Sequence, residues 1–173
     1  RQIAQRRPEL FKSATLCLQV SKDIASGLVH MHKRNILHND LHPGNILMQG
    51  DESSEGKVPR AVIADFGLSS TLSTSQTFKI PEHMKISSCD PKKDFMQSYG
   101  HIAPEVVENK PTSQLSDIYS YGITTQFMWI PQGTQNEEII KMIKQCTSLD
   151  EESRPQSMKK ILSGLKCINF TSL

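Results

Sequence analysis

One segment of this chain is apolar on nearly every side. Its large apolar residues crowd residues 117–130, and in order they are Ile118, Tyr119, Tyr121, Ile123, Phe127, Met128, Trp129 and Ile130. A helix that is apolar all round must be buried in the middle of a domain. Pro131 follows the run and ends it, because proline cannot continue a helix. The sequence therefore predicts a central buried helix that other elements must cover.

Amphipathic patterns flank this segment. Over residues 9–33 apolar residues recur at steps of three and four, which predicts a helix with one buried stripe. The stripe consists of Leu16, Val20, Ile24, Leu28 and Met31. Two further stripes predict C-terminal helices within 136–168. Short apolar runs at 46–48 and 61–64 predict a hairpin of short strands, so the fold class is α+β and mainly α-helical.

Composition limits the classes of protein that fit. The chain has 173 residues, enough for one domain with its own core, and 20 basic against 18 acidic residues leave a formal charge of only +2. This balance does not favour nucleic-acid binding. The four cysteines lack CxxC spacing, which predicts no zinc site and favours reduced thiols in an intracellular, cytoplasmic protein. No run approaches the roughly 18 apolar residues of a membrane span, so we expect membrane contact only if a longer parent protein supplies it.

Short motifs follow one another along the chain. They are His-Asn-Asp-Leu-His-Pro-Gly-Asn at 38–45, Asp-Phe-Gly at 65–67, Ala-Pro-Glu at 103–105, Ser-Asp-Ile-Tyr-Ser-Tyr-Gly at 116–122 and Arg-Pro at 154–155. Singly, several suit ordinary structure, because Asp, Asn, Pro and Gly form turns and Pro-Glu suits the start of a helix. In this order, on these predicted elements, they resemble the eukaryotic protein kinase superfamily. The resemblance covers residues 9–168.

The resemblance implies the C-terminal lobe of a kinase domain, in which a short β-hairpin carries the catalytic loop and the Asp-Phe-Gly motif. The partial domain spans 1–173, with a helix at 9–33, catalytic loop and strand at 36–48, strand and Asp-Phe-Gly at 60–67, activation segment at 68–105, central helix at 115–130 and C-terminal helices at 136–168. A complete kinase also has a Gly-rich loop, a strand Lys and a helix Glu. None precedes Asp40 here, so we expect the N-terminal lobe to be absent from this chain.

Phosphoryl transfer needs a carboxylate to orient the incoming hydroxyl and accept its proton, and oxygen ligands to hold Mg²⁺ on the phosphates of ATP. By resemblance, Asp40 is the catalytic base, and Asn45 and Asp65 hold Mg²⁺. Gly67 belongs to the cofactor-binding motif and frees the loop that follows. His42 stands where Ser/Thr kinases have a Lys that touches the transferring phosphate. A neutral imidazole supplies no fixed charge, so we expect slower chemistry.

Other motif residues have structural roles by resemblance. His38 opens the catalytic loop and Phe66 packs inward beside Asp65. Asp117 hydrogen-bonds the backbone of the catalytic loop. Glu105 and Arg154 form a buried ion pair.

Two departures from the family affect regulation and substrate binding. Asn39 replaces the Arg on which a phosphorylated activation segment docks, and Asn offers no charge for that purpose. We therefore expect activation without such a switch, despite the many hydroxyls between residues 69 and 98. The stretch 129–136 is shorter than in the family, which predicts that part of the substrate-docking surface is missing.

The favoured function is transfer of the γ-phosphate of ATP to a Ser or Thr hydroxyl of a protein substrate, with weak or no activity in the isolated chain. One alternative is an aminoglycoside or choline-type small-molecule kinase, whose catalytic loop also matches 38–45 but which lacks the Ala-Pro-Glu passage. The other is a pseudokinase-like binding module. A shift of the melting temperature by Mg²⁺-ATP distinguishes the last from an enzyme.

Overall fold

The computed structural model describes residues 13–49, 59–72, 100–130 and 133–168. The helices are α2 (Ala14–His32), α4 (Pro104–Val107), α5 (Gln114–Trp129), α6 (Glu137–Cys146) and α7 (Met158–Cys167). The strands are β1 (Ile36–Leu37), β2 (Ile46–Gln49), β3 (Arg60–Ile63) and β4 (Ser70–Thr71), with a 3₁₀ turn, η2 (Pro43–Asn45), before β2. The fold is thus mainly helical with small antiparallel sheets, as predicted.

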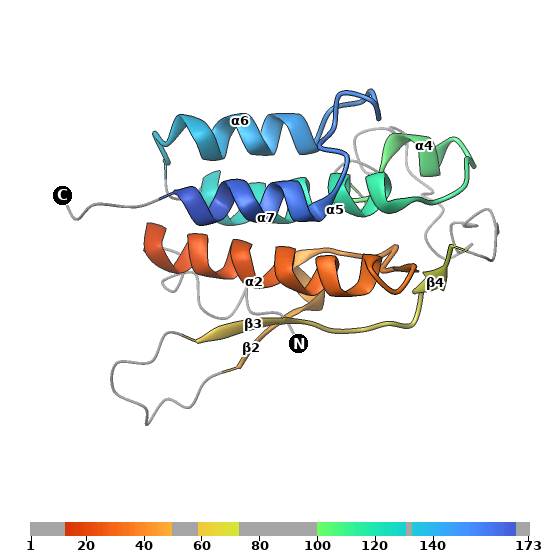
Figure 1. Ribbon diagram of the computed structural model, residues 1–173, viewed down its shortest axis with the longest axis horizontal. Coiled ribbons are helices and arrows are strands. Elements are labelled where there is room, and N and C mark those ends of the chain that lie inside the picture. The colour runs from red at the N-terminus through yellow and green to blue at the C-terminus, as the bar shows by residue number, and fades with distance from the viewer. Residues whose placement is uncertain (1–12, 50–58, 73–99, 131–132, 169–173) are drawn as a thin grey trace, which may run out of the picture.

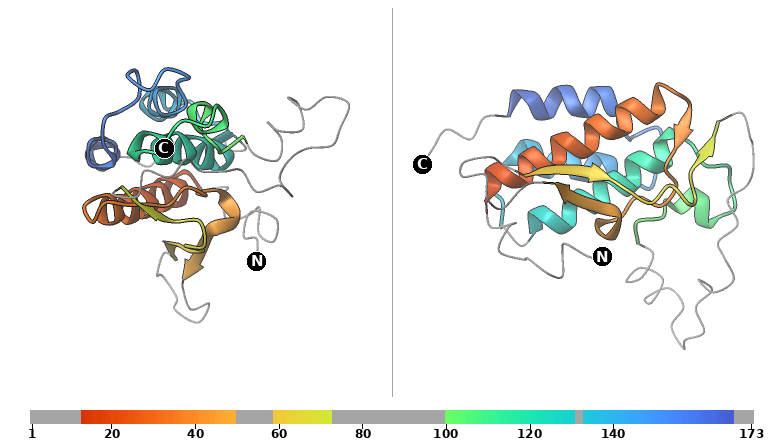
Figure 2. Two further views of the ribbon diagram at one scale, coloured as in Figure 1. Left: turned by 90° about the vertical axis from the view of Figure 1, so that its right-hand side faces the viewer. Right: turned by 90° about the horizontal axis from the view of Figure 1, so that it is seen from below.

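The long helices are stacked in layers with their axes along the molecule (Figure 1). α2 lies between the α5 and α7 helices on one side and the β2–β3 pair on the other, and it contacts α5, α7 and β3. α6 packs on the side of α5 that faces away from α2, as the end-on view on the left of Figure 2 also shows. None of the helices in the described ranges is long and apolar enough to cross a membrane.

Helix α2 forms where the first apolar stripe predicts it. Ser13 caps it, because its hydroxyl accepts a hydrogen bond from the backbone N–H of Leu16 at 3.3 Å. The stripe residues Val20, Ile24 and Leu28 are fully buried. Residues 9–12 of the predicted helix lie outside the described residues.

Helix α5 is the buried centre of the helical stack, as predicted from its composition. Trp129 and Tyr121 are fully buried, and both have hydrogen bonds for their polar atoms. Trp129 Nε1 donates to Ser21 Oγ at 3.2 Å, and the Tyr121 hydroxyl donates to the Ser21 carbonyl at 3.1 Å. The prediction of burial on every side is wrong at Phe127 and Ile130, which are 62% and 65% exposed. The elements that cover α5 leave one side of this end open to solvent, although Met128 and Trp129 at the same end are buried.

The strand pairing brings two loops together. β2 pairs with β3, with Ile46 opposite Ile63, and β1 pairs with β4, with Leu37 opposite Ser70. The chain therefore passes from β1 to β2 through residues 38–45 and from β3 to β4 through residues 64–69. Each loop therefore starts at one strand pair and ends at the other. Because both loops join the β1–β4 pair to the β2–β3 pair, they run side by side.

Candidate active site

The first of these loops is anchored by the first turn of α5. The carboxylate of Asp117, which is 1% exposed, accepts hydrogen bonds of 2.9 Å from the backbone N–H groups of His38 and Asn39. Its Oδ2 atom also lies 2.9 Å from His32 Nε2. One buried carboxylate thus fixes two successive peptide units directly before Asp40. This is the contact predicted for Asp117.

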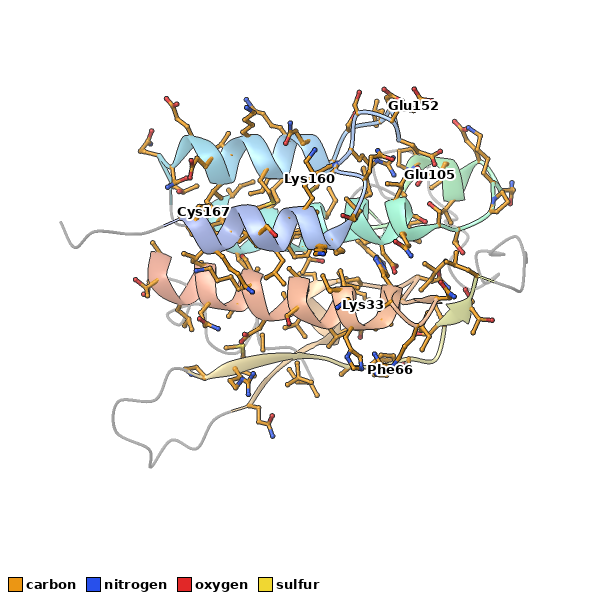
Figure 3. The ribbon with its side chains drawn as sticks, viewed as in Figure 1. Lys33, Phe66, Glu105, Glu152, Lys160 and Cys167 are labelled. Carbon is orange, nitrogen blue, oxygen red and sulfur yellow. The ribbon has the colours of Figure 1, made fainter. Side chains whose placement is uncertain are left out.

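His38 joins the two loops. Its Nδ1 accepts a hydrogen bond from the Asp40 backbone N–H at 3.3 Å, so Nε2 has the proton and donates to the Ala64 carbonyl at 3.2 Å. The imidazole is fully buried and lies 5.6 Å from the ring of Phe66. Phe66 itself is 55% exposed, so the prediction that it packs inward is wrong (Figure 3). The Phe66 ring lies beside the buried imidazole of His38 but is not itself enclosed.

Asn45 contacts the carboxylate of Asp40. Its Nδ2 donates to the Asp40 carbonyl at 2.8 Å and to Asp40 Oδ2 at 3.2 Å. The Asn45 carbonyl accepts a hydrogen bond from the Ala64 backbone N–H at 2.8 Å. The Oδ1 atom of Asn45 accepts no hydrogen bond within the described part of the chain, so it is available to a metal ion.

Asp65 follows Ala64, whose backbone N–H is hydrogen-bonded to Asn45, so the backbone of Asp65 lies close to Asn45. Its backbone is left-handed, with φ of 61°, which costs a non-glycine residue roughly 1 kcal/mol. The carboxylate accepts a hydrogen bond from the Gly67 backbone N–H at 3.1 Å, within its own turn. The structure thus places Asp40 and Asn45 in direct contact and links Asp65 to them through the backbone of Ala64.

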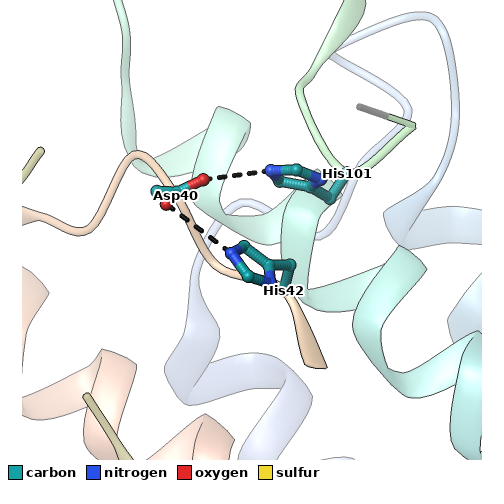
Figure 4. A group of neighbouring side chains, drawn as sticks. All are labelled: Asp40, His42 and His101. Atoms are coloured by element: carbon teal, nitrogen blue, oxygen red, sulfur yellow. Dashed lines mark hydrogen bonds and ion pairs between the residues drawn. The ribbon is translucent and has the colours of Figure 1, made fainter. Parts of the chain in front are cut away.

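Two histidines face the carboxylate of Asp40 (Figure 4). His101 Nε2 lies 3.1 Å from Oδ1, and His42 Nε2 lies 3.6 Å from Oδ2. Burial disfavours the charged carboxylate, but hydrogen bonds and electrostatic attraction from His101 and His42 outweigh it and hold the pKa of Asp40 well below its ordinary value. Asp40 is therefore ionised at neutral pH.

Comparison with known proteins identifies the family. The family model described as "Protein kinase domain" matches residues 3–132. The chain belongs to the protein kinase domain family. It is 36% identical over 108 residues to the proto-oncogene serine/threonine-protein kinase mos of Sus scrofa, which covers 62% of this chain and 26% of that protein. It is 35% identical over 109 residues to the human dual specificity testis-specific protein kinase 2, covering 63% of this chain and 16% of that protein. The chain spans about a quarter or less of the length of these relatives.

The kinase motif residue Glu105 forms the ion pair predicted with Arg154. Two hydrogen bonds of 2.7 and 2.8 Å join the guanidinium to the carboxylate, and both side chains are buried. Arg154 also donates to the carbonyls of Leu115 and Ser148, at 3.0 and 2.8 Å. Arg154 thereby ties α4, which carries Glu105, to α5 and to the turn before α7.

Asn39, which replaces the usual kinase Arg, has a contact that the sequence did not predict. Its Nδ2 donates to the Leu68 carbonyl and to Ser70 Oγ, both at 2.8 Å. The neutral amide thus connects the loop of residues 38–45 to the start of the predicted activation segment, 68–105. Residues 73–99 of that segment lie outside the described residues, so the expected independence of phosphorylation stays a prediction.

His101 is a residue of the site that the sequence did not reveal. It is 61 residues from Asp40 in the chain and stands two residues before the Ala-Pro-Glu motif. Its carbonyl accepts a 2.6 Å hydrogen bond from Ser120 Oγ, which fixes its backbone against α5. A histidine beside a kinase motif was the only local signal, and it was too weak to predict the contact.

Proposed function

We propose that this chain forms the C-terminal lobe of a protein kinase that transfers the γ-phosphate of ATP to a Ser or Thr hydroxyl of a protein substrate. The observation that supports this most is the contact between Asp40 and Asn45 on a loop fixed by Asp117. The catalytic carboxylate and an amide ligand are held together before any substrate binds. Membership of the protein kinase family favours this over a small-molecule kinase.

Asp40 is the base in this proposal. Its ionised carboxylate accepts a hydrogen bond from the substrate hydroxyl and orients the oxygen toward the γ-phosphorus. As the oxygen–phosphorus bond forms and the bond to ADP breaks, the hydroxyl proton passes to Asp40. Because phosphoryl transfer is mostly a matter of position and charge, a carboxylate of low pKa serves mainly to hold the hydroxyl in place.

Asn45 and Asp65 would hold Mg²⁺, and the donor set suits that ion. An amide oxygen and a carboxylate are hard ligands of the kind that Mg²⁺ prefers beside phosphate oxygens. When bound, the ion would neutralise part of the negative charge on the phosphates. Asp65 presents its carboxylate from a turn held by the hydrogen bond to Gly67, on the exposed side of the loop.

His42 stands at the position of the lysine that touches the transferring phosphate. A neutral imidazole offers a hydrogen bond but no fixed charge, so we expect slow transfer. Because no Gly-rich loop or strand Lys precedes Asp40 in these 173 residues, we also expect weak nucleotide binding and little turnover by the chain alone.

A second candidate is a pseudokinase-like binding module. Hydrogen bonds within the chain favour this candidate, because they already use carboxylate oxygens that a substrate or metal would need. Both oxygens of Asp40 are hydrogen-bonded, to His101 and to Asn45. One oxygen of Asp65 is hydrogen-bonded to Gly67. In that case nucleotide would not bind, and the surface of the lobe would hold a partner protein.

Thermal unfolding with Mg²⁺-ATP decides between the two candidates. ATP at ten times its Kd stabilises the folded state by about 1.4 kcal/mol, which raises the melting temperature of a chain of this size by about 3–5 °C. The kinase proposal predicts this rise with Mg²⁺-ATP, a smaller one with ATP alone and none in Asp65→Asn. Because binding by the chain alone is expected to be weak, the titration extends to the solubility limit of Mg²⁺-ATP, and no rise in the wild-type chain over that range would favour the binding module.

A further inference from the structure

Asp40, His42 and His101 form a compact cluster of possible metal ligands. One ligand atom from each, a carboxylate oxygen and the two imidazole nitrogens, all lie within 4.8 Å of one another. The imidazole rings are tilted against each other with their centroids 4.9 Å apart, and both Nε2 atoms point at the carboxylate (Figure 4). Two remote parts of the chain, the catalytic loop and the segment before α4, thus converge on one point.

The ligand types distinguish this cluster from the magnesium site. Mg²⁺ prefers oxygen ligands, whereas two imidazoles and one carboxylate suit zinc and similar transition metals. Three protein ligands leave a fourth position of a tetrahedral ion open to water or another ligand. The side chains of His101, Asp40 and His42 are 12%, 19% and 32% exposed, so an ion can reach them from solvent.

We propose that Asp40, His42 and His101 bind a divalent transition-metal ion of the zinc class, at a site separate from the Mg²⁺ position at Asn45 and Asp65. The cysteine spacing of the sequence predicted no zinc site, and the cluster contains no cysteine. Its existence depends on His101, which only the folded chain brings to Asp40.

The surroundings of the cluster orient two of the three ligands. Asn45 Nδ2 donates to Asp40 Oδ2, which holds the carboxylate in place as neighbours of metal ligands commonly do. The hydrogen bond from Ser120 to the His101 carbonyl holds the second ligand against α5. Both contacts are compatible with a bound ion.

The third ligand must change one hydrogen bond. His42 Nδ1 accepts a hydrogen bond from the Gly44 backbone N–H at 3.0 Å, so the proton of the neutral ring is on Nε2. Coordination of a metal through Nε2 requires the proton to be on Nδ1 instead. Two N–H donors, His42 Nδ1 and Gly44 N, would then face each other, so the hydrogen bond between them breaks. We therefore expect an affinity below that of a structural zinc site.

A metal at this site would inhibit phosphoryl transfer, a consequence that rests on the proposed function. The ion would take the Asp40 oxygen that a substrate hydroxyl needs, so metal and substrate would exclude each other. Binding of the ion itself does not depend on kinase activity, and it can be measured on the 173-residue chain.

Titration with Co²⁺, whose visible absorption reports tetrahedral coordination, tests the proposal. We expect one saturable equivalent in the wild-type chain, with the absorption removed by Zn²⁺. His101→Phe keeps a ring beside His42 and should weaken binding at least tenfold. His42→Asn, whose amide oxygen can still accept from Gly44, should do the same. His30→Gln, on the exposed face of α2, is the matched control and should bind as wild type.

The outcomes separate this site from the magnesium site. Each variant is first checked for a cooperative melting transition, and the two histidine variants provide independent tests if one fails to fold. Absence of saturable Co²⁺ binding in the wild-type chain overturns the proposal, and so does binding as tight as wild type in both His101→Phe and His42→Asn. A stabilisation by Mg²⁺-ATP that persists in His101→Phe leaves the proposed function intact even then.

Discussion

The guanidinium of Arg154 and the carboxylate of Glu105 form a bidentate ion pair. Its two N–O distances are 2.7 and 2.8 Å, and the side chains are 0% and 3% exposed. Removing one partner of such a pair leaves a buried charge without compensation. We predict that Glu105→Gln lowers the free energy of unfolding by about 3 kcal/mol, as measured by urea denaturation.

The control for this variant is the surface pair of Lys110 and Glu108, at 2.9 Å with both side chains more than half exposed. Solvent screens that pair, so Glu108→Gln should leave the denaturation midpoint within experimental error of wild type. Equal effects of Glu105→Gln and Glu108→Gln would show that burial of Arg154 contributes nothing.

Asp117 should control the order of the loop of residues 38–45. Asn at this position keeps the size but replaces one acceptor oxygen with an N–H donor, which opposes the backbone N–H of His38 or Asn39. We predict a loss of about 2 kcal/mol in unfolding free energy and faster hydrogen exchange at these two amides. Asp150→Asn, at an exposed turn, is the control. Unchanged exchange at His38 in Asp117→Asn would contradict the role assigned to the carboxylate.

The helices could be predicted from the sequence, because a helix that buries one face has apolar residues at every third or fourth position. Val20, Ile24 and Leu28 lie four residues apart and all are fully buried. The pair of Glu105 and Arg154 could also be predicted, since each belongs to a motif whose partner is known by resemblance. In both cases the necessary signal is in the order of the residues.

The remaining features depend on packing that no local pattern encodes. Phe66 and Phe127 are exposed although apolar side chains usually favour the interior, because neighbouring elements do not cover them. His101 meets Asp40 only because the fold places residues 100–103 beside the loop of residues 38–45. The pairing of the two-residue strands β1 and β4 likewise was not predicted, since runs this short have no period.

Gly122 tests the packing of α5 on α6. A Cβ added there would lie 2.6 Å from Cys146 Cβ and 2.8 Å from Thr147 Cγ2, closer than real side chains come. We predict that Gly122→Ala destabilises the fold by about 1–3 kcal/mol, despite the better helix propensity of Ala.

Gly164, within α7, is the matched control, because a Cβ there meets nothing within 4 Å. Gly164→Ala should raise stability by up to about 1 kcal/mol. Denaturation curves that move in the same direction for both variants would contradict the close contact between Gly122 and Cys146.

The two histidines should set the ionisation of Asp40. Because its folded pKa lies below the unfolded value of about 3.9, ionised Asp40 stabilises the fold above about pH 4. This stabilisation is lost as the pH falls further, through the folded pKa. His101→Phe removes the hydrogen bond and the electrostatic attraction of His101, so the effect of burial is opposed by His42 alone and the pKa of Asp40 should rise. Carboxyl ¹³C NMR measures it, with Asp150 as an internal reference, and an unchanged Asp40 titration would contradict the assignment.

The proposed magnesium-phosphate site at Asn45 and Asp65 can be tested most directly by paramagnetic NMR with Mn²⁺-ATP in place of Mg²⁺-ATP. This method detects weak binding, because the ion broadens signals of nearby nuclei even at low occupancy. We predict selective broadening of backbone amides in 40–45 and 64–67 that persists in His101→Phe and disappears in Asp65→Asn. Broadening spread over the whole chain, or unaffected by Asp65→Asn, would contradict the phosphoryl-transfer site.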